Sequence, residues 1–330
     1  MEKTSPEKHG FFYRVGRTAL NTVKPAFSTI WFLLYVMIPV SLMVLILDYS
    51  GILYHIARFM NPVMRFLDLP GEAALVFLSS IFINIYSAIA VIDTLSLTGR
   101  EITILATMCL IAHNFFVECA VMKKTGSSLS KMVLLRILCA LFAGWALRFI
   151  VPESAGRAAS GMGLAHAGTI GFDPAGLPAV LLVWLMDSGV LILKIILIVF
   201  TLMFVQKLLE EFGVIRFLGK ITGPVMKILG LSPNTGYLWI VANLAGLAYG
   251  AAILIEQVRS QAVSPSEADL FNHHVGISHS QLEDTLLFVA IGVPLFWAAL
   301  PRLILAIIVV WLERIRRDLV RRSFRVKIAS

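Results

Sequence analysis

The sequence predicts an all-α integral membrane protein made of two inverted repeats, each with three spanning helices, an amphipathic helix and a re-entrant hairpin. Three observations support this prediction. Hydrophobic residues make up 58% of the chain and charged residues 15%, whereas about a quarter of the residues in a soluble domain are charged. Polar residues recur in the same order in the two halves. Basic residues gather in segments that would share one side of a membrane.

The repeat is visible in matched polar residues. NPVMRFLDL at 61–69 aligns with GPVMKILGL at 223–231 at an offset of 162 residues. The offset then becomes 166, and three further pairs align: His113 with His279, Glu118 with Asp284, and Arg136 with Arg302. Composition alone would produce matching apolar residues, but not histidines, acids and arginines matched in order. We therefore predict an internal duplication, which membrane transporters often contain.

Five regions follow from this duplication. They are a cytoplasmic N-terminal segment (1–25), repeat 1 (26–151), a linker rich in Gly and Ala (152–178), repeat 2 (179–312) and a basic cytoplasmic tail (313–330). Within a repeat we expect, in order, an apolar helix, an amphipathic stretch, a second apolar helix, a polar segment and a last apolar helix. The second apolar helices are expected at 71–96 and 233–256, and the polar segments at 101–124 and 267–290.

The polar segments are predicted to be the re-entrant hairpins. Residues 267–284 carry four acidic residues and three histidines, and each central charge in lipid costs about 2.5–3.5 kcal/mol. Two hairpins would place 20 Lys and Arg on the inner side and 4 on the outer side, against 15 and 9 if both segments spanned. Each repeat then crosses three times, so the second enters from the opposite side. Full spanning stays open as the alternative.

The same charge bias predicts a multi-pass protein of the cell inner membrane with both termini cytoplasmic. The basic run in the tail is interpreted as an anchor near the membrane lipids rather than as a nucleic-acid site. The three cysteines lie in apolar segments with no disulfide or metal spacing. Nothing in the sequence decides whether the chain forms a homodimer.

The candidate site lies in the two polar segments. Each contains a histidine five residues before an acidic residue: His113 before Glu118, and His279 before Asp284. The residue directly after the histidine is Asn114 in the first segment and Ser280 in the second. On a continuous helix the two side chains would diverge by about 140°, but at a helix break they would converge. Imidazoles and desolvated carboxylates suit proton coupling or cation binding. The structural alternative is that Glu118 pairs with Arg136 and Asp284 with Arg302.

Other polar residues are weaker candidates. The second apolar helices carry amide and phenol side chains near their middle: Asn84, Tyr86, Asn243 and Tyr249. If these helices break at the midplane, the side chains would face a ligand. Otherwise they would mark places where helices pack closely. A divalent metal would accept the ligand set His274, His279, Glu283 and Asp284. No catalytic motif is present, so we expect no enzyme and no cofactor beyond a bound cation.

Three features of the chain resemble the Gate, or nucleoside-recognition, family. They are the PVM segments with their following residues (62–72 and 224–234), REITILATMCLIAHNFF (100–116) and HHVGISHSQLEDT (273–285). That family includes spore maturation proteins A and B, the membrane core of ferrous iron transporter B and part of concentrative nucleoside transporters. The resemblance covers about 50–150 and 212–312 and implies two fused Gate domains with an inverted-repeat, transporter-like core.

The departures from the family restrict the function. FINIYSA at 82–88 lacks the Gly-Cys stretch of the iron transporters, and no GTP-binding domain is present. The leading prediction is a transporter or permease for a small polar solute, with a nucleoside or related metabolite as the class that the resemblance suggests. The alternatives are a divalent-metal permease and a membrane assembly or signalling component that transports nothing.

Overall fold

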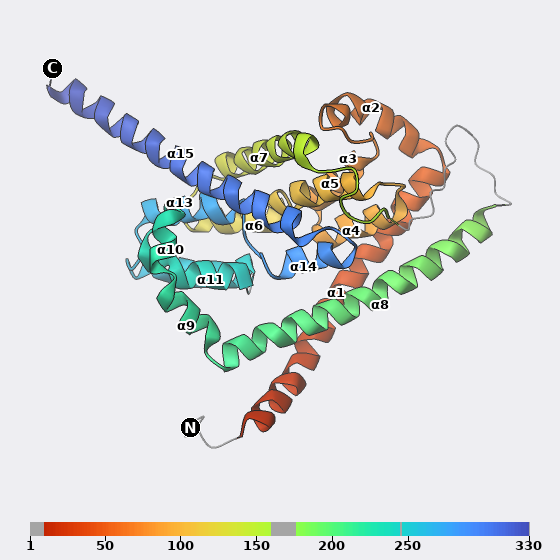
Figure 1. Cartoon of the computed structure of the whole chain (residues 1–330), viewed down its shortest axis with the longest axis horizontal. Helices are drawn as coiled ribbons and strands as arrows, with labels where there is room; N and C mark the ends of the chain where they lie inside the picture. The colour runs from red at the N-terminus through yellow and green to blue at the C-terminus, as the bar shows by residue number, and fades with distance from the viewer. Residues whose placement is uncertain (1–9, 160–175, 245, 330) are drawn as a thin grey trace.

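The structure is a computed structural model that describes residues 10–159, 176–244 and 246–329, and within these ranges every regular element is a helix (Figure 1). Side chains at 48, 53, 247–252 and 324–329 are not described. Repeat 1 contains α1 (Phe11–Tyr49), α2 (Ile52–Phe66), α3 (Ala73–Phe82), α4 (Ile85–Thr94), α5 (Gly99–Ile111), α6 (Phe115–Lys124) and α7 (Leu129–Ile150).

Repeat 2 follows the same order. It contains α8 (Leu177–Glu211), α9 (Val214–Ile221), α10 (Gly223–Ile228), the 3₁₀ turn η2 (Pro233–Thr235), α11 (Gly236–Leu244), α12 (Leu247–Arg259), α13 (Pro265–Val275), α14 (Glu283–Ala290) and α15 (Leu295–Ala329). Residues 11–25 of the expected N-terminal segment belong to α1, and the basic tail continues α15. Most of the expected linker lies outside the described residues.

Backbone geometry repeats as the side chains do. Four pairs of residues adopt left-handed backbone conformations at matched positions: Gly51 and Gly213 (φ 74° and 70°), Asp68 and Gly230 (61° and 73°), Asn114 and Ser280 (48° and 47°), and Gly126 and Gly292 (100° and 104°). Capping boxes also begin both α5, at Thr98, and α13, at Ser264. Because each of these four conformations recurs at an offset of 162 or 166, the two halves turn in the same way at these places.

Two groups of contacts define opposite ends of the helix bundle. The basic face is defined by Ser127, Ser266, Asp269 and Arg317, which are joined by hydrogen bonds of Ser127 to Asp269 and of Arg317 to Ser266 and Asp269. The opposite face is defined by Leu97, Val151, Arg157 and Gly292. Three hydrogen bonds to backbone carbonyls connect it: from Arg100 to Val151, from Ala159 to Leu97 and from Arg157 to Gly292. Helix α7 connects them with 22 residues, a rise of about 33 Å that matches the hydrocarbon thickness.

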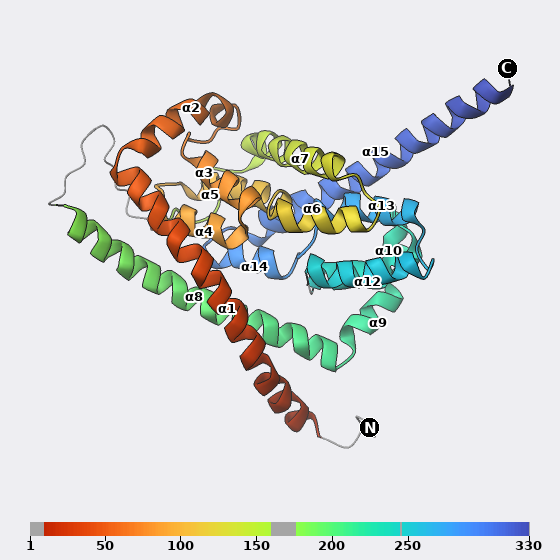
Figure 2. The same ribbon diagram turned by 180° about the vertical axis from the view of Figure 1, so that it is seen from behind.

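These contacts show which segments cross. Helix α5 begins beside Leu97 on the opposite face, and α6 ends just before Ser127 on the basic face. Helix α13 begins beside Ser266 on the basic face, and α14 ends just before Gly292. Helices α5 and α6 lie end to end in Figure 2. Both polar segments therefore span the bundle as broken helices.

The re-entrant hairpins lie one segment earlier than expected. Arg148 donates to the carbonyl of Phe66 at 2.5 Å, which places the end of α2 on the opposite face, where α5 also begins. Helices α3 and α4 pack against each other, so they enter and return between these points. Trp311 donates to Ile228 on the basic face at 3.0 Å, and α11 and α12 form the matching hairpin.

The prediction that 101–124 and 267–290 are hairpins is thus wrong, because both segments run from one face of the bundle to the other. Its premise was that acidic and imidazole groups would face lipid. Instead His113, Glu118, His279 and Asp284 are all buried between the repeats, so the lipid penalty does not arise. In each repeat three segments run between the two faces of the bundle, and the repeats run in opposite directions, with α1 starting on the basic side and α8 on the other.

Among the residues that the structure describes, five segments are long and apolar enough to cross a membrane: Phe11–Leu47, Gly99–Lys124, Leu129–Ile150, Leu177–Glu211 and Leu295–Ser323. This confirms the predicted all-α membrane fold. Helices α1 and α8 pack along each other, and Arg14 of α1 holds Glu211 of α8 at 3.0 Å. Figure 1 shows this pair crossing one side of the bundle, with the broken helices enclosed on the other side.

Candidate functional site

Two histidines stand where the broken helices are interrupted. His113 follows α5 and His279 lies in the turn between α13 and α14. In each ring Nδ1 lies close to the carbonyl four residues earlier, at 2.9 Å from Cys109 and 2.6 Å from Val275. Because only an N–H can donate to a carbonyl, both Nδ1 atoms carry hydrogen. This leaves the two Nε2 atoms to face the interior, and the ring centroids lie 4.9 Å apart.

Two carboxylates meet these Nε2 atoms. Glu118 Oε1 lies 3.1 Å from His113 Nε2 and 3.2 Å from His279 Nε2. Asp284 Oδ2 lies 3.4 Å from His113 Nε2. A neutral imidazole with hydrogen on Nδ1 presents a lone pair at Nε2, which repels a carboxylate lone pair. A proton or another cation must therefore occupy the space between them, so the cluster is built to hold positive charge.

The breaks are held by the hairpins of the same repeat. Asn114 N–H donates to the Ser80 carbonyl at 2.9 Å, and Ser280 N–H donates to the Ala242 carbonyl at 3.0 Å. Ser80 and Ala242 lie on α3 and α11, the first helices of the hairpins. The break in α5–α6 comes 13 residues after its start and 10 residues before its end. The site thus lies near the middle of the membrane crossing.

A buried arginine accompanies each break, and the two are bound differently. Arg136 Nη2 lies 2.6 Å from Glu118 Oε2, and its Nε donates to the Ile111 carbonyl. Arg302 donates to Thr285 Oγ1 at 2.6 Å, to Gln281 Oε1 at 3.0 Å and to the His279 carbonyl at 3.2 Å. The predicted ion pair between Arg136 and Glu118 is therefore present, whereas Arg302 has no ion pair with Asp284 among the described contacts.

The difference follows from two pairs of matched residues. Around Arg136 lie the ring of Phe115, 4.9 Å away, and the weakly accepting Cys119 Sγ at 3.9 Å. At the offset of 166 these become Gln281 and Thr285 in repeat 2, both of which accept from Arg302. Since Arg136 lacks such acceptors, it takes one oxygen of Glu118. Arg302 is already satisfied, and Asp284 remains available to His113.

The weaker candidates lie around this cluster. Tyr86 donates its hydroxyl to Glu283 Oε1 at 3.1 Å, next to Asp284. Asn84 caps α4 by accepting from the Ser87 N–H at 2.9 Å. Asn243 donates to the Trp239 carbonyl at 2.8 Å, and its own side-chain oxygen has no partner among the described residues. Tyr249 lies on α12, and its side chain is outside the described part of the chain.

The structure gathers a different set of metal ligands from the predicted one. Among the described residues, His113, His279 and Asp284 each offer one ligand atom, and the three atoms lie within 4.8 Å of one another. Of the predicted set, His274 instead lies beside the Trp239 ring, 6.2 Å between centroids, and neither of its ring nitrogens has a described hydrogen-bond partner. Glu283 is bound to Tyr86. Two imidazoles and a carboxylate are a donor set that divalent transition metals accept.

Sequence reasoning missed the groups that place the site. The carbonyls of Ser80 and Ala242 and those of Cys109 and Val275 carry no signal in residue type, because every residue has a carbonyl. Gln281 and Thr285 did carry a signal. Their substitution for Phe115 and Cys119 is visible at the same offset that revealed the histidines.

Comparison with known proteins agrees with the fold. Residues 30–128 match the Gate family, described as nucleoside recognition. The chain is 29% identical over 282 residues, covering 86% of this chain and 89% of the relative, to the uncharacterized membrane protein YvoD of Bacillus subtilis strain 168. No solved structure matches. The predicted resemblance is thus confirmed for the first repeat, where residues 30–128 are similar to the Gate nucleoside-recognition family, and the relative is likewise a membrane protein.

Proposed function

We propose that this protein is a membrane transporter for a small polar solute and that the cluster of His113, His279, Glu118 and Asp284 binds a coupling proton. The observation that carries the proposal is that four titratable groups, two from each repeat, meet in the buried centre. A proton held between the repeats links them, and its release leaves lone pairs that repel one another. Loss of the proton would therefore favour separation of the repeats.

The inverted architecture supports this proposal. In many transporters the site lies at the repeat interface near the midplane and is formed by broken helices. Here each break is attached by backbone hydrogen bonds to the hairpin of its own repeat, so a break and its hairpin would move together. The Gate family's description as nucleoside recognition makes nucleosides and related metabolites the first solutes to test.

The proposed orientation has both termini in the cytoplasm of a cell inner membrane. Lys123, Lys124 and Lys131 lie at or near the basic face, together with Arg316 and Arg317 of α15 and the lysines of α9 and α10. The opposite face carries far fewer cations. Positive charge on cytoplasmic loops is the general rule for such proteins, and the corrected assignment of crossings keeps the bias.

Transport can be tested with purified protein in liposomes that contain a pH-sensitive dye. Adding a transported nucleoside outside should change the internal pH when the wild type is present. His113→Ala and His279→Ala should abolish the change, whereas His55→Ala, an exposed histidine on α2, should not. A flux that is equal in all three variants would remove the cluster from the transport mechanism. Absence of flux for every solute would favour an assembly component.

A divalent-metal permease is the second candidate, and the grouping of His113, His279 and Asp284 favours it. Calorimetric titration with Zn²⁺ and Mn²⁺ separates the two. Saturable binding lost in Asp284→Asn would support metal transport. Proton flux without metal binding would support the first proposal.

A further inference from the structure

Helix α2 has three distinct faces. Large apolar side chains are exposed on one of them: Ile52, Phe59, Val63 and Phe66. Met64 is buried against the protein on a second. Tyr54, Arg58, Asn61 and Arg65 are spaced by four, three and four residues, which places them together on a third face. A helix with one apolar and one basic face lies in the interface between acyl chains and headgroups.

The side of α2 that carries Arg58 and Arg65 borders an open pocket. It has a volume of about 680 Å³ and is lined by Tyr54, Arg58, Asn61 and Arg65 together with the loop that contains Gly71 and Glu72. That loop lies unusually close to α2, since a Cβ at Gly71 would stand 2.1 Å from the Ala57 carbonyl oxygen. The pocket is therefore a feature of how α2 docks on the hairpin rather than of side-chain position alone.

The two arginines are available to an anion. Both are exposed, and neither has an acidic partner among the described contacts. The neighbouring carboxylate of Asp68 is already held by Arg100 at 2.7 Å. Glu72 is the acidic residue that lines the pocket, so two positive charges oppose one negative charge there.

We propose that this pocket binds the phosphate of an anionic phospholipid headgroup through Arg58 and Arg65, with Tyr54 and Asn61 as further polar contacts. Guanidinium groups match phosphate oxygens in geometry and charge. The phosphate belongs to a lipid because the adjacent exposed face, with Phe59 and Phe66, places the pocket at the level of the headgroups. This inference does not depend on what the protein transports.

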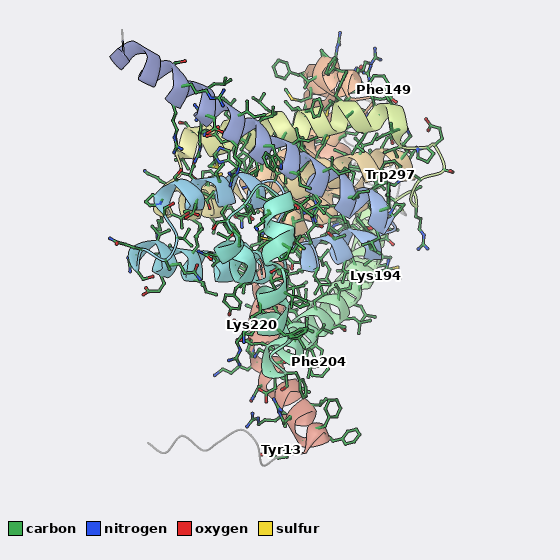
Figure 3. The ribbon with its side chains drawn as sticks, turned by 60° about the vertical axis from the view of Figure 1, so that its left-hand side comes forward. Tyr13, Phe149, Lys194, Phe204, Lys220 and Trp297 are labelled. Atoms are coloured by element: carbon green, nitrogen blue, oxygen red, sulfur yellow. The ribbon has the colours of Figure 1, made fainter. Side chains whose placement is uncertain are left out.

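Repeat 2 carries cations at the equivalent positions. Lys220 and Lys227 match Arg58 and Arg65 at the offset of 162, and both are exposed. Lys220 lies on the outside of α9 in Figure 3. Since α9 and α10 end at the basic face and α2 ends at the opposite face, the duplication presents one cationic pair to each membrane surface.

The test measures binding of fluorescent phosphatidylglycerol to the full chain in nonionic detergent. The parent carries Lys220→Gln and Lys227→Gln, which removes the matching pair. Adding Arg58→Gln and Arg65→Gln should weaken binding about thirtyfold, from about fivefold per basic residue. Glu72→Gln should tighten it severalfold, because it removes the opposing charge. Lys123→Gln with Lys124→Gln, an exposed cation pair elsewhere, should leave affinity unchanged.

Three outcomes would overturn the proposal. Equal affinity with and without the two arginines would remove them from the site. Equal binding of phosphatidylcholine would show that the pocket does not select anionic lipid. Displacement of the lipid by inorganic phosphate at similar concentration would identify a free-anion site instead. The Glu72→Gln variant keeps the test decisive if the arginine variants unfold.

Discussion

Asn114 and Ser280 adopt the same left-handed backbone conformation, with φ of 48° and 47°. Each donates its N–H to a hairpin carbonyl of its own repeat, Ser80 or Ala242. This shared geometry turns the chain at the point where the histidines enter the centre. Asn tolerates left-handed backbone better than Ser does, since its side chain hydrogen-bonds locally.

We therefore expect Ser280→Gly to raise the melting temperature slightly, because glycine removes up to about 1 kcal/mol of backbone strain. Ser280→Val should lower it by several degrees, since a β-branched residue is disfavoured at positive φ. Asn114→Gly should be close to neutral. Thermal unfolding in detergent measures all three. A stable Ser280→Val variant would contradict the assigned backbone conformation.

The Arg136–Glu118 ion pair predicts that a substitution of Glu118 restores stability lost by a substitution of Arg136. Arg136→Met should destabilise strongly, by about 3–5 kcal/mol, because it removes the partner of the buried Glu118 Oε2. Adding Glu118→Gln should restore much of the loss, since the buried charge is then removed. Melting temperatures of the single and double variants form the test. If the double variant is no better than Arg136→Met, the guanidinium contributes through packing rather than through charge.

Thr285 is expected to support Arg302 through its hydroxyl. Thr285→Val keeps the volume but removes the acceptor 2.6 Å from Nη2, at a cost of about 1–3 kcal/mol for a buried charged donor. The matched control is Thr22→Val. That threonine is also buried, but its hydroxyl donates only to the Thr18 carbonyl of its own helix. Equal melting temperatures for the two variants would contradict the role of Thr285.

Gly71 should be intolerant of a side chain. Gly71→Ala would place Cβ 2.1 Å from the Ala57 carbonyl oxygen, so α2 must move away from the hairpin. We expect a fall of several degrees in melting temperature. Gly189→Ala on α8 meets nothing within 4 Å and serves as the control. The prediction fails if both alanine variants unfold at the wild-type temperature.

Cysteine labelling distinguishes the two assignments of the crossings. The native cysteines are buried and would be replaced. Single cysteines at Ser128, Ser260 and Ser323 should react from one side only, the cytoplasm. A cysteine at Ser96 should react from outside. Ser260 is decisive, because polar segments that formed hairpins would place it outside instead. External labelling at Ser260 would restore the hairpin assignment.

The sequence by itself determined the class, the duplication and the residues that pair across it. These follow from composition and from polar residues matched at offsets of 162 and 166 residues. A high content of apolar residues would not by itself produce such matches between polar residues. Only the tertiary structure decided which segment returns and which crosses. A return by the polar segments or by the apolar helices before them gives the same charge count, because Arg100 and Arg259 merely exchange sides. The choice depends on whether polar side chains face lipid or each other. The asymmetric roles of Arg136 and Arg302 also needed the fold, because an arginine takes whichever acceptors packing brings within reach.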